Sequence, residues 1–305
     1  MPPEGNFPGV WKWGGSYGGE TCTATLDKCL PVQVQGLTEI VAVAAGNGSY
    51  ALRADGTLWS WGFNWSGDVG DGSNINSLTP QAPILTDVIA VAAGSGNSLA
   101  LKVNGTVWTW GSNGDRVGHP TMLTSLSPVQ VPGLTDVIAI STGSSASFAL
   151  KSDGTVWSWG VNNYGQLGDG TTIDRIVPAQ ITALGNSVTA ISDQLALKAD
   201  GTTWRWGLYA SVYTSGFVYF FDTTPVKVEL ADMASIARKN LALRNNDTLW
   251  FWETDTSNNY KYYQVPGVAG VISMATCQGS VLILESGSFS DTTAPTTTIS
   301  PAGGE

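Results

Sequence analysis

A tryptophan pair recurs along almost the whole chain and is the feature that most constrains the fold. Twelve of the 13 tryptophans fall in Trp-x-Trp pairs spaced 46 to 49 residues apart: Trp11/Trp13, Trp59/Trp61, Trp108/Trp110, Trp157/Trp159, Trp204/Trp206 and Trp250/Trp252. Alternate residues of a β-strand point to the same side, so each pair places two indoles on one strand face. A period of this size predicts a repeat architecture in which each unit buries these indoles against the next.

Each unit contains short β-branched and aromatic runs separated by turn residues. The best-preserved unit spans 128–170, and its runs predict four strands, two of them joined by the hairpin signal Asp153-Gly154. The same turn recurs as Asp55-Gly56, Asn104-Gly105 and Asp200-Gly201. Four strands per unit favour the blade of a β-propeller over the coil of a linear β-solenoid. The sequence therefore predicts an all-β chain that forms a single β-propeller.

The two ends of the repeat region carry complementary half-units. A Trp-x-Trp strand at 10–14 has no first half-repeat before it, whereas 270–287 holds two strands with no Trp-x-Trp strand after them. Pairing the N-terminal strand with the C-terminal hairpin would complete one blade and remove two exposed sheet edges. We predict six four-stranded blades closed in this way over residues 10–289, with 1–9 as a lead-in and 290–305 as a Thr/Pro-rich linker to a further domain.

The stretch Ala149–Gly168, ALKSDGTVWSWGVNNYGQLG, resembles the repeat of the regulator of chromosome condensation family. The resemblance extends over residues 10 to 288 and implies a β-propeller. That family includes a nuclear nucleotide-exchange factor for a small GTPase, many binding modules and a secreted bacterial inhibitor of β-lactamases. Its well-known members have seven blades, so six is a departure, and this chain has no basic tail like that of the exchange factor.

The composition excludes several classes of function. With 24 acidic and 14 basic residues the net charge is −10, which disfavours nucleic acid as a partner because phosphates would be repelled. The single histidine, His119, leaves no multi-histidine metal site, and the spacing of Asp68, Asp71 and Asp169 fits no calcium loop. We expect no enzymatic activity, no cofactor and no metal. No apolar run is long enough for a membrane span.

Aromatic residues in the loops are the candidate binding residues. In the unit that contains Trp204/Trp206, residues 208–221 replace the Gly-Gln-Leu-Gly loop with a segment that holds six aromatic residues. This segment forms either a long hairpin packed on itself or a contact patch. Trp65, which lies outside the pairs, either contacts a partner or fills a gap between blades. The candidates are Phe63, Trp65, Tyr164, Tyr209, Tyr213, Phe217, Tyr219, Phe220, Phe221, Tyr260 and Tyr262.

Two cysteines and the C-terminal composition indicate where the protein works. Cys22 and Cys29 are close in sequence and are expected to form a disulfide, which requires an oxidising compartment; free or metal-binding thiols are the alternative. The tail 290–305 resembles junctions in bacterial secreted and surface proteins. We expect a non-enzymatic binding module of a bacterial extracellular or cell-surface multidomain protein that engages a protein or glycan through propeller loops. The alternatives are a secreted enzyme inhibitor, like the β-lactamase type, and a structural scaffold or filament subunit.

Overall fold

The computed structural model describes residues 10–12, 32–80, 82–111, 118–119, 124–143, 146–213, 217–228, 232–237, 241–246, 248–254, 260–265, 271–277 and 280–285. Strands and turns make up almost all of these residues, and one 3-10 helix, η2 (Thr182–Leu184), interrupts them. Across the described part of the chain, no helix has the length and apolarity that crossing a membrane requires. The all-β prediction is confirmed for these residues.

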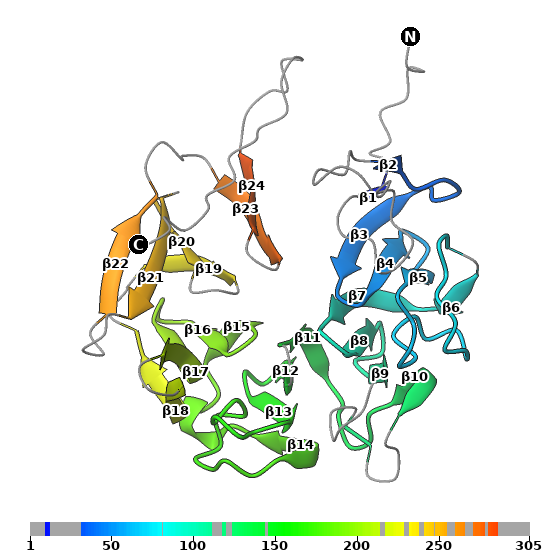
Figure 1. Ribbon diagram of the computed structural model, residues 1–305. Helices are drawn as coiled ribbons and strands as arrows, with labels where there is room; N and C mark the ends of the chain where they lie inside the picture. The colour runs from blue at the N-terminus through cyan, green and yellow to red at the C-terminus, as the bar shows by residue number, and fades with distance from the viewer. Residues whose placement is uncertain are drawn as a thin grey trace.

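Five four-stranded antiparallel sheets follow one another along the chain, and in each the strands pair in chain order. The first sheet contains β3 (Ile40–Ala45), β4 (Gly48–Arg53), β5 (Leu58–Gly62) and β6 (Pro83–Leu85). The second contains β7 (Val88–Ala93), β8 (Asn97–Lys102), β9 (Val107–Gly111) and β10 (Ser125–Gln130), and the third β11 (Val137–Thr142), β12 (Ala146–Lys151), β13 (Val156–Gly160) and β14 (Arg175–Gln180). The fourth contains β15 (Val188–Ser192), β16 (Leu195–Lys198), β17 (Thr203–Tyr213) and β18 (Phe217–Lys227), and the fifth β19 (Met233–Ala237), β20 (Leu241–Arg244), β21 (Leu249–Thr254) and β22 (Tyr260–Gln264). Figure 1 shows these sheets arranged around a common centre, with the first strand of each sheet innermost.

The predicted hairpin turn ties the second and third strands of every sheet together. In the third sheet, Asp153 Oδ1 accepts hydrogen bonds from the Thr155 amide at 3.0 Å and the Thr155 hydroxyl at 2.6 Å, which hold the pKa of Asp153 below its usual value. The Thr155 hydroxyl in turn accepts a hydrogen bond from Trp157 Nε1 at 3.2 Å. Lys151 Nζ lies 5.8 Å from the centre of the Trp157 ring, a cation–π contact. The other four sheets repeat this arrangement around Trp59, Trp108, Trp204 and Trp250.

The core lies between neighbouring sheets. The second tryptophan of a pair is buried there, as Trp110 and Trp159 show with no exposed surface, whereas the first, as at Trp157, is only half-buried under its cation. Between the second and third sheets, Trp159 packs with side chains from both, including Leu99 and Val131. Full burial of a large apolar side chain stabilises the fold by about 1.5–3 kcal/mol, so these interfaces hold consecutive sheets together.

Two further two-stranded sheets lie at the ends of the arc (Figure 1). One joins β1 (Trp11–Lys12) to β2 (Val32–Gln33), and the other joins β23 (Val271–Cys277) to β24 (Ser280–Glu285). No pairing of β1 with β24 occurs within the residues that the structure describes. Cys22, Cys29 and the segments 1–9 and 290–305 lie outside those residues.

Candidate functional site

The segments that connect the third and fourth strands occupy equivalent places in the sheets. Each begins after a glycine that pairs with the first residue of the returning chain: Gly62 with Ser77, Gly160 with Arg175 and Gly207 with Asp222. The residues between the paired positions are 63–76, 161–174 and 208–221, which is fourteen in each case. We call them the first, third and fourth loops, after their sheets.

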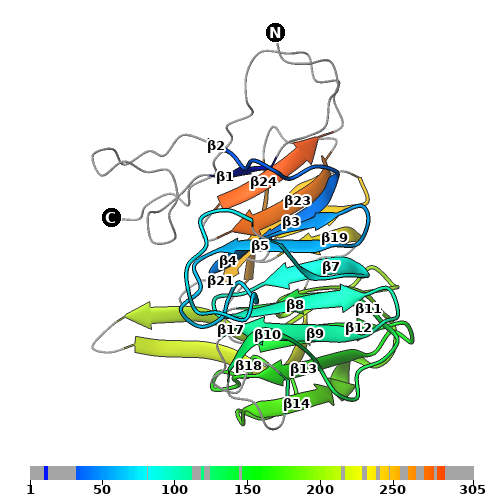
Figure 2. The ribbon, with the colours of Figure 1, turned by 90° about the vertical axis from the view of Figure 1, so that its right-hand side faces the viewer.

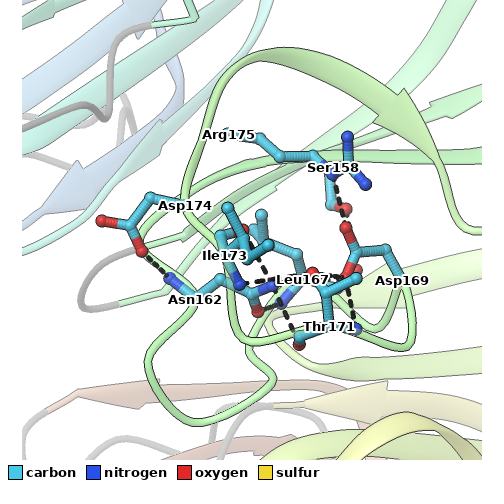
Figure 3. A network of polar contacts seen from close by, with 8 residues as sticks. All are labelled: Ser158, Asn162, Leu167, Asp169, Thr171, Ile173, Asp174 and Arg175. Atoms are coloured by element: carbon cyan, nitrogen blue, oxygen red, sulfur yellow. Dashed lines mark hydrogen bonds and ion pairs between the residues drawn. The ribbon is translucent and has the colours of Figure 1, made fainter.

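The third loop folds around one buried amide (Figure 3). Asn162 is fully buried, and its Nδ2 donates to Asp169 Oδ1 at 3.2 Å, Thr171 O at 3.0 Å and Ile173 O at 3.1 Å. Its Oδ1 accepts a hydrogen bond from the Leu167 amide at 2.9 Å. One side chain therefore satisfies backbone groups on both halves of the loop and keeps the loop compact.

An ion pair closes the end of the third loop. Asp169 Oδ1 accepts from the Thr171 amide and hydroxyl at 3.0 and 2.7 Å, and Asp169 Oδ2 accepts from Arg175 Nε. The Asp169 side chain is only 5% exposed, and Arg175 lies against its carboxylate. Burial raises the pKa of Asp169, but the hydrogen bonds from Thr171 and Arg175 outweigh this effect and hold the pKa below its usual value.

The first loop repeats this design with a different surface. Asn64 is the buried amide, with its Nδ2 3.2 Å from Asp71 Oδ1 and its Oδ1 2.9 Å from the Val69 amide. Trp65 is 73% exposed, and its ring centre lies 5.3 Å from that of Phe63. An indole with this exposure does not fill a gap between sheets, so Phe63 and Trp65 remain candidate contacts for a partner.

The fourth loop lacks the residues that make the other two compact. Tyr209 stands in the place of Asn162, so no amide is available to join the two halves of the loop. Three glycines of the third loop adopt positive φ angles of 68° to 84°, which residues with a β-carbon rarely adopt. In the fourth loop, the residues at the places of Gly165, Gly168 and Gly170 are Val212, Ser215 and Phe217. The segment consequently continues the strands instead of folding back.

Residues 208–221 form the end of an extended hairpin, which we call the arm. The arm pairs Leu208 with Phe221, Ala210 with Phe220, Ser211 with Tyr219, Val212 with Val218 and Tyr213 with Phe217. Strand β16 pairs with β17 only as far as Arg205, so the arm is two-stranded. Figure 2 shows β17 and β18 projecting beyond the other sheets. The arm has six of the chain's 17 Phe and Tyr residues and no charged residue.

In the described part of the arm, an aromatic contact reaches the preceding sheet. Phe221 is 37% exposed, and its ring meets that of Tyr164 edge-on with centres 5.9 Å apart. The structure therefore brings together the candidates Tyr164 and Phe221, as it does Phe63 and Trp65 in the first loop. The side chains of the remaining candidates in the arm lie outside the described part, and only their backbone positions are given: Tyr209, Tyr213, Phe217, Tyr219 and Phe220.

The fifth sheet places its tyrosines in different environments. Tyr262 is half-buried and packs against a core cluster that includes Met233, so it contributes to the core. Tyr263 is 38% exposed and stacks on Phe251 with ring centres 5.1 Å apart. Tyr260 pairs with Thr254 through the backbone, and its side chain is outside the described part.

Sequence reasoning missed an ion pair at the base of the arm. Arg205 is 4% exposed, and its Nη2 lies 2.8 Å from Oδ2 of Asp222, the residue that follows the arm. A buried arginine needs a carboxylate partner, so this pair fixes the point where the arm leaves the sheet. The signal was available, because Arg205 is a charged residue between two tryptophans where the third sheet has Ser158.

The sheets, their meander order and their common centre define a β-propeller. Three consecutive segments, residues 55–101, 104–150 and 153–192, match the Regulator of chromosome condensation (RCC1) repeat. A second pattern with the same description matches residues 88–116 and 137–166. Residues 55–192 of the chain therefore carry repeats of the RCC1 family.

Several solved structures share this fold. Human WBSCR16 is 21% identical over 77% of this chain and 69% of that chain, with a TM-score of 0.63. Yeast RCC1 (Prp20) bound to Kap60 is 22% identical over 80% of this chain and 65% of that chain, with a TM-score of 0.65. Prp20p of Saccharomyces cerevisiae, described with its binding to Gsp1p and histones, is 24% identical over 70% and 57%, with a TM-score of 0.57. This chain thus covers less than two thirds of both yeast chains, and no curated protein matches it in sequence.

Proposed function

We propose that the protein is a non-enzymatic protein-binding module and that the arm is its main contact. The main support is the composition of the arm: its fourteen residues include six aromatic side chains and no charged residue, although the net charge of the chain is −10. Both Prp20 structures, which share the fold, were described with protein partners: Kap60 for one, and Gsp1p and histones for the other.

The physical properties of the arm favour a protein partner. A two-stranded hairpin is only marginally stable in water. Phe221, at the base of the arm, contacts Tyr164 of the preceding sheet. Aromatic residues are enriched at the centres of protein interfaces, where charged residues are depleted. The arm also presents strand edges, to which an extended segment of a partner can add. A protein surface would satisfy both the aromatic groups and these edges.

A loop exchange tests this proposal with little change to the blade. Residues 208–221 are replaced by residues 161–174, because both segments have fourteen residues and join equivalent backbone pairs. We call this variant the arm chimera. The full chain and the arm chimera are used as baits against envelope and secreted-protein extracts and on a glycan array.

We expect a specific protein to bind the full chain and not the arm chimera. Thermal melting should show that both proteins are folded. If the arm chimera binds every partner that the full chain binds, the contact lies on another surface, such as that of Trp65. Binding to a glycan in place of any protein would contradict the protein-binding part of the proposal.

We also propose that the module works outside the cell or on the bacterial surface. The support comes from the sequence, in the spacing of Cys22 and Cys29 and in the acidic composition. Mass spectrometry of natively produced protein without reductant should find these two cysteines in one disulfide. Free thiols in such a sample would contradict this location.

We further propose that the ring has six blades and that β23, β24, β1 and β2 form the sixth. The pair Trp11↔Gln33 has the register of Trp108↔Gln130 and Trp157↔Gln180, as expected for third and fourth strands. The β1–β2 sheet also packs on the first sheet through residues equivalent to those between the second and third sheets: Val10, Val34, Leu37, Ile40, Ala51 and Trp61 correspond to Val107, Val131, Leu134, Val137, Ala149 and Trp159. At the other end, β23 lies against β19 as first strands do in neighbouring sheets.

A further inference from the structure

A cavity of about 460 Å³ opens between the first and second sheets. Its polar lining comes from Ser60, Asp71 and Ser127, and its apolar lining includes Val69, Ile84 and the two prolines Pro83 and Pro128. A volume in this range is typical of sites that hold small ligands or single side chains. The cavity is separate from the arm, which belongs to the fourth sheet.

Asp71 occupies the position that Asp169 has in the third loop, but the first sheet has no arginine at the position of Arg175. In both residues Oδ1 accepts from the buried asparagine and from the residue two positions later, with Ser73 N at 2.9 Å and Ser73 Oγ at 2.8 Å from Asp71. Oδ2 of Asp169 binds Arg175, whereas Ser77 stands at that position in the first sheet. Asp71 is exposed, and within the described residues no side chain donates to its Oδ2.

The hydroxyl of Ser60 is a second polar atom of the cavity wall that lacks a hydrogen-bond partner within the described residues. Ser60 is 2% exposed, and its buried hydroxyl makes no hydrogen bond within the described part of the chain. In the third sheet the equivalent Ser158 donates to Leu167 O at 2.8 Å. A buried hydroxyl without a partner costs free energy that a ligand with hydrogen-bonding groups can recover.

We propose that this cavity binds a guanidinium group, as carried by arginine. The third sheet shows the interaction within the same molecule, because Arg175 covers the carboxylate equivalent to that of Asp71. A guanidinium offers a planar fork of N–H donors to the Asp71 carboxylate and further donors to the Ser60 and Ser127 hydroxyls. The aliphatic stem of an arginine fits the apolar wall at Val69 and Ile84. The net charge of −10 also attracts a cation.

The test uses the complete chain and small probes of defined charge. Binding of Nα-acetyl-arginine methylamide is measured by ligand-observed NMR and calorimetry, beside its lysine and citrulline analogues and a short arginine-containing peptide. Asp71→Asn removes the anion, and Ser77→Arg installs the cation that the third sheet carries. Asp55→Asn is the matched control, because it removes the same charge at a turn where the second sheet has Asn104. The arm chimera is a second control, since its cavity is unchanged.

The arginine probe should bind with one-to-one stoichiometry and more tightly than the lysine and citrulline analogues. Asp71→Asn and Ser77→Arg should each weaken binding at least ~10-fold, because a charged hydrogen bond is lost or the cavity is filled. Asp55→Asn and the arm chimera should bind as the full chain does, which keeps this proposal separate from the function of the arm. Much tighter binding of the peptide than of the free probe would identify protein-borne arginine as the source, and equal binding a free guanidinium compound. Absence of arginine binding, or equal binding by Asp71→Asn, would overturn the proposal.

Discussion

At the scale of single residues, buried polar groups decide which loops are compact. Asn162 and Asn64 are each fully buried and each join both halves of a loop. Where Tyr209 replaces this asparagine, the chain extends into the arm. The buried asparagine, together with the glycines at positive φ, therefore separates a closed loop from a projecting hairpin.

Asn162→Ala should destabilise the protein strongly. The substitution leaves the Leu167 amide and the carbonyls of Thr171 and Ile173 without their partner, which costs about 2–4 kcal/mol in the free energy of unfolding. Urea denaturation measures the change. The exposed neighbour Asn163→Ala is the control and should change stability by no more than ~0.5 kcal/mol; equal effects of the two variants would contradict the role assigned to Asn162.

Asp68→Asn should stabilise the protein at neutral pH. Asp68 is 2% exposed, its Oδ2 is buried without a hydrogen bond within the described residues, and burial raises the pKa of the carboxyl. Because the folded-state pKa lies above the unfolded one, the ionised carboxylate destabilises the fold at higher pH, and this cost fades as the pH falls through the folded-state pKa. Thermal melting from pH 8 to pH 4 should show the variant melting a few degrees higher at pH 7 and the difference shrinking towards pH 4. A difference that grows on acidification would refute this reading.

At the scale of elements, hairpin turns connect neighbouring blades as well as strands. The turn at Gly154 has a positive φ of 78°, and the Gly154 carbonyl accepts a hydrogen bond from the Val188 amide of the next sheet at 3.2 Å. A β-carbon at Gly154 would lie 2.2 Å from the Asn186 carbonyl oxygen. The sheets are thus held together at their turns in addition to the core.

Gly154→Ala should therefore cost more than the same change at Gly133. Both residues have positive φ angles, 78° and 76°, but a β-carbon at Gly133 would meet nothing within 4 Å. We expect Gly133→Ala to destabilise by about 1 kcal/mol from backbone strain alone and Gly154→Ala by about 2–4 kcal/mol from strain plus displacement of the next sheet. Chemical denaturation of both variants checks this, and equal losses would show that the contact between the sheets is weak.

At the scale of the whole molecule, the proposed sixth blade joins the ends of the chain. In the third sheet the second and third strands pair in a register that places Leu150 opposite Val156. The same register in the proposed sixth blade would place Leu284 opposite Val10. A closed ring removes the last exposed sheet edges and should protect both end segments from solvent exchange.

Removal of residues 1–14 should consequently expose the hairpin at the other end. Hydrogen exchange monitored by mass spectrometry should show slow exchange at 271–285 in the full chain and exchange at least ~10-fold faster in the truncated chain, because β24 loses its neighbour. Unchanged exchange at 271–285 would contradict closure through β1.

Much of this arrangement was predictable from the sequence. The Trp-x-Trp period and the Asp-Gly turns predicted the four strands per repeat, since both signals are local and depend only on strand alternation and turn chemistry. The replacement of Asn162 by Tyr209 at constant loop length could also have predicted the arm. The cavity beside Asp71 was not predictable, because it depends on the side-chain packing of two sheets and on a carboxylate that lacks the cation found two sheets away.

Whether the arm binds a protein is decided by the affinity of the purified partner for the full chain and for the arm chimera. The arm chimera, folded and with its Asp71 cavity intact, should bind the partner at least ~100-fold more weakly, because several central aromatic contacts are lost. Equal affinity of the two proteins for the partner would contradict this prediction.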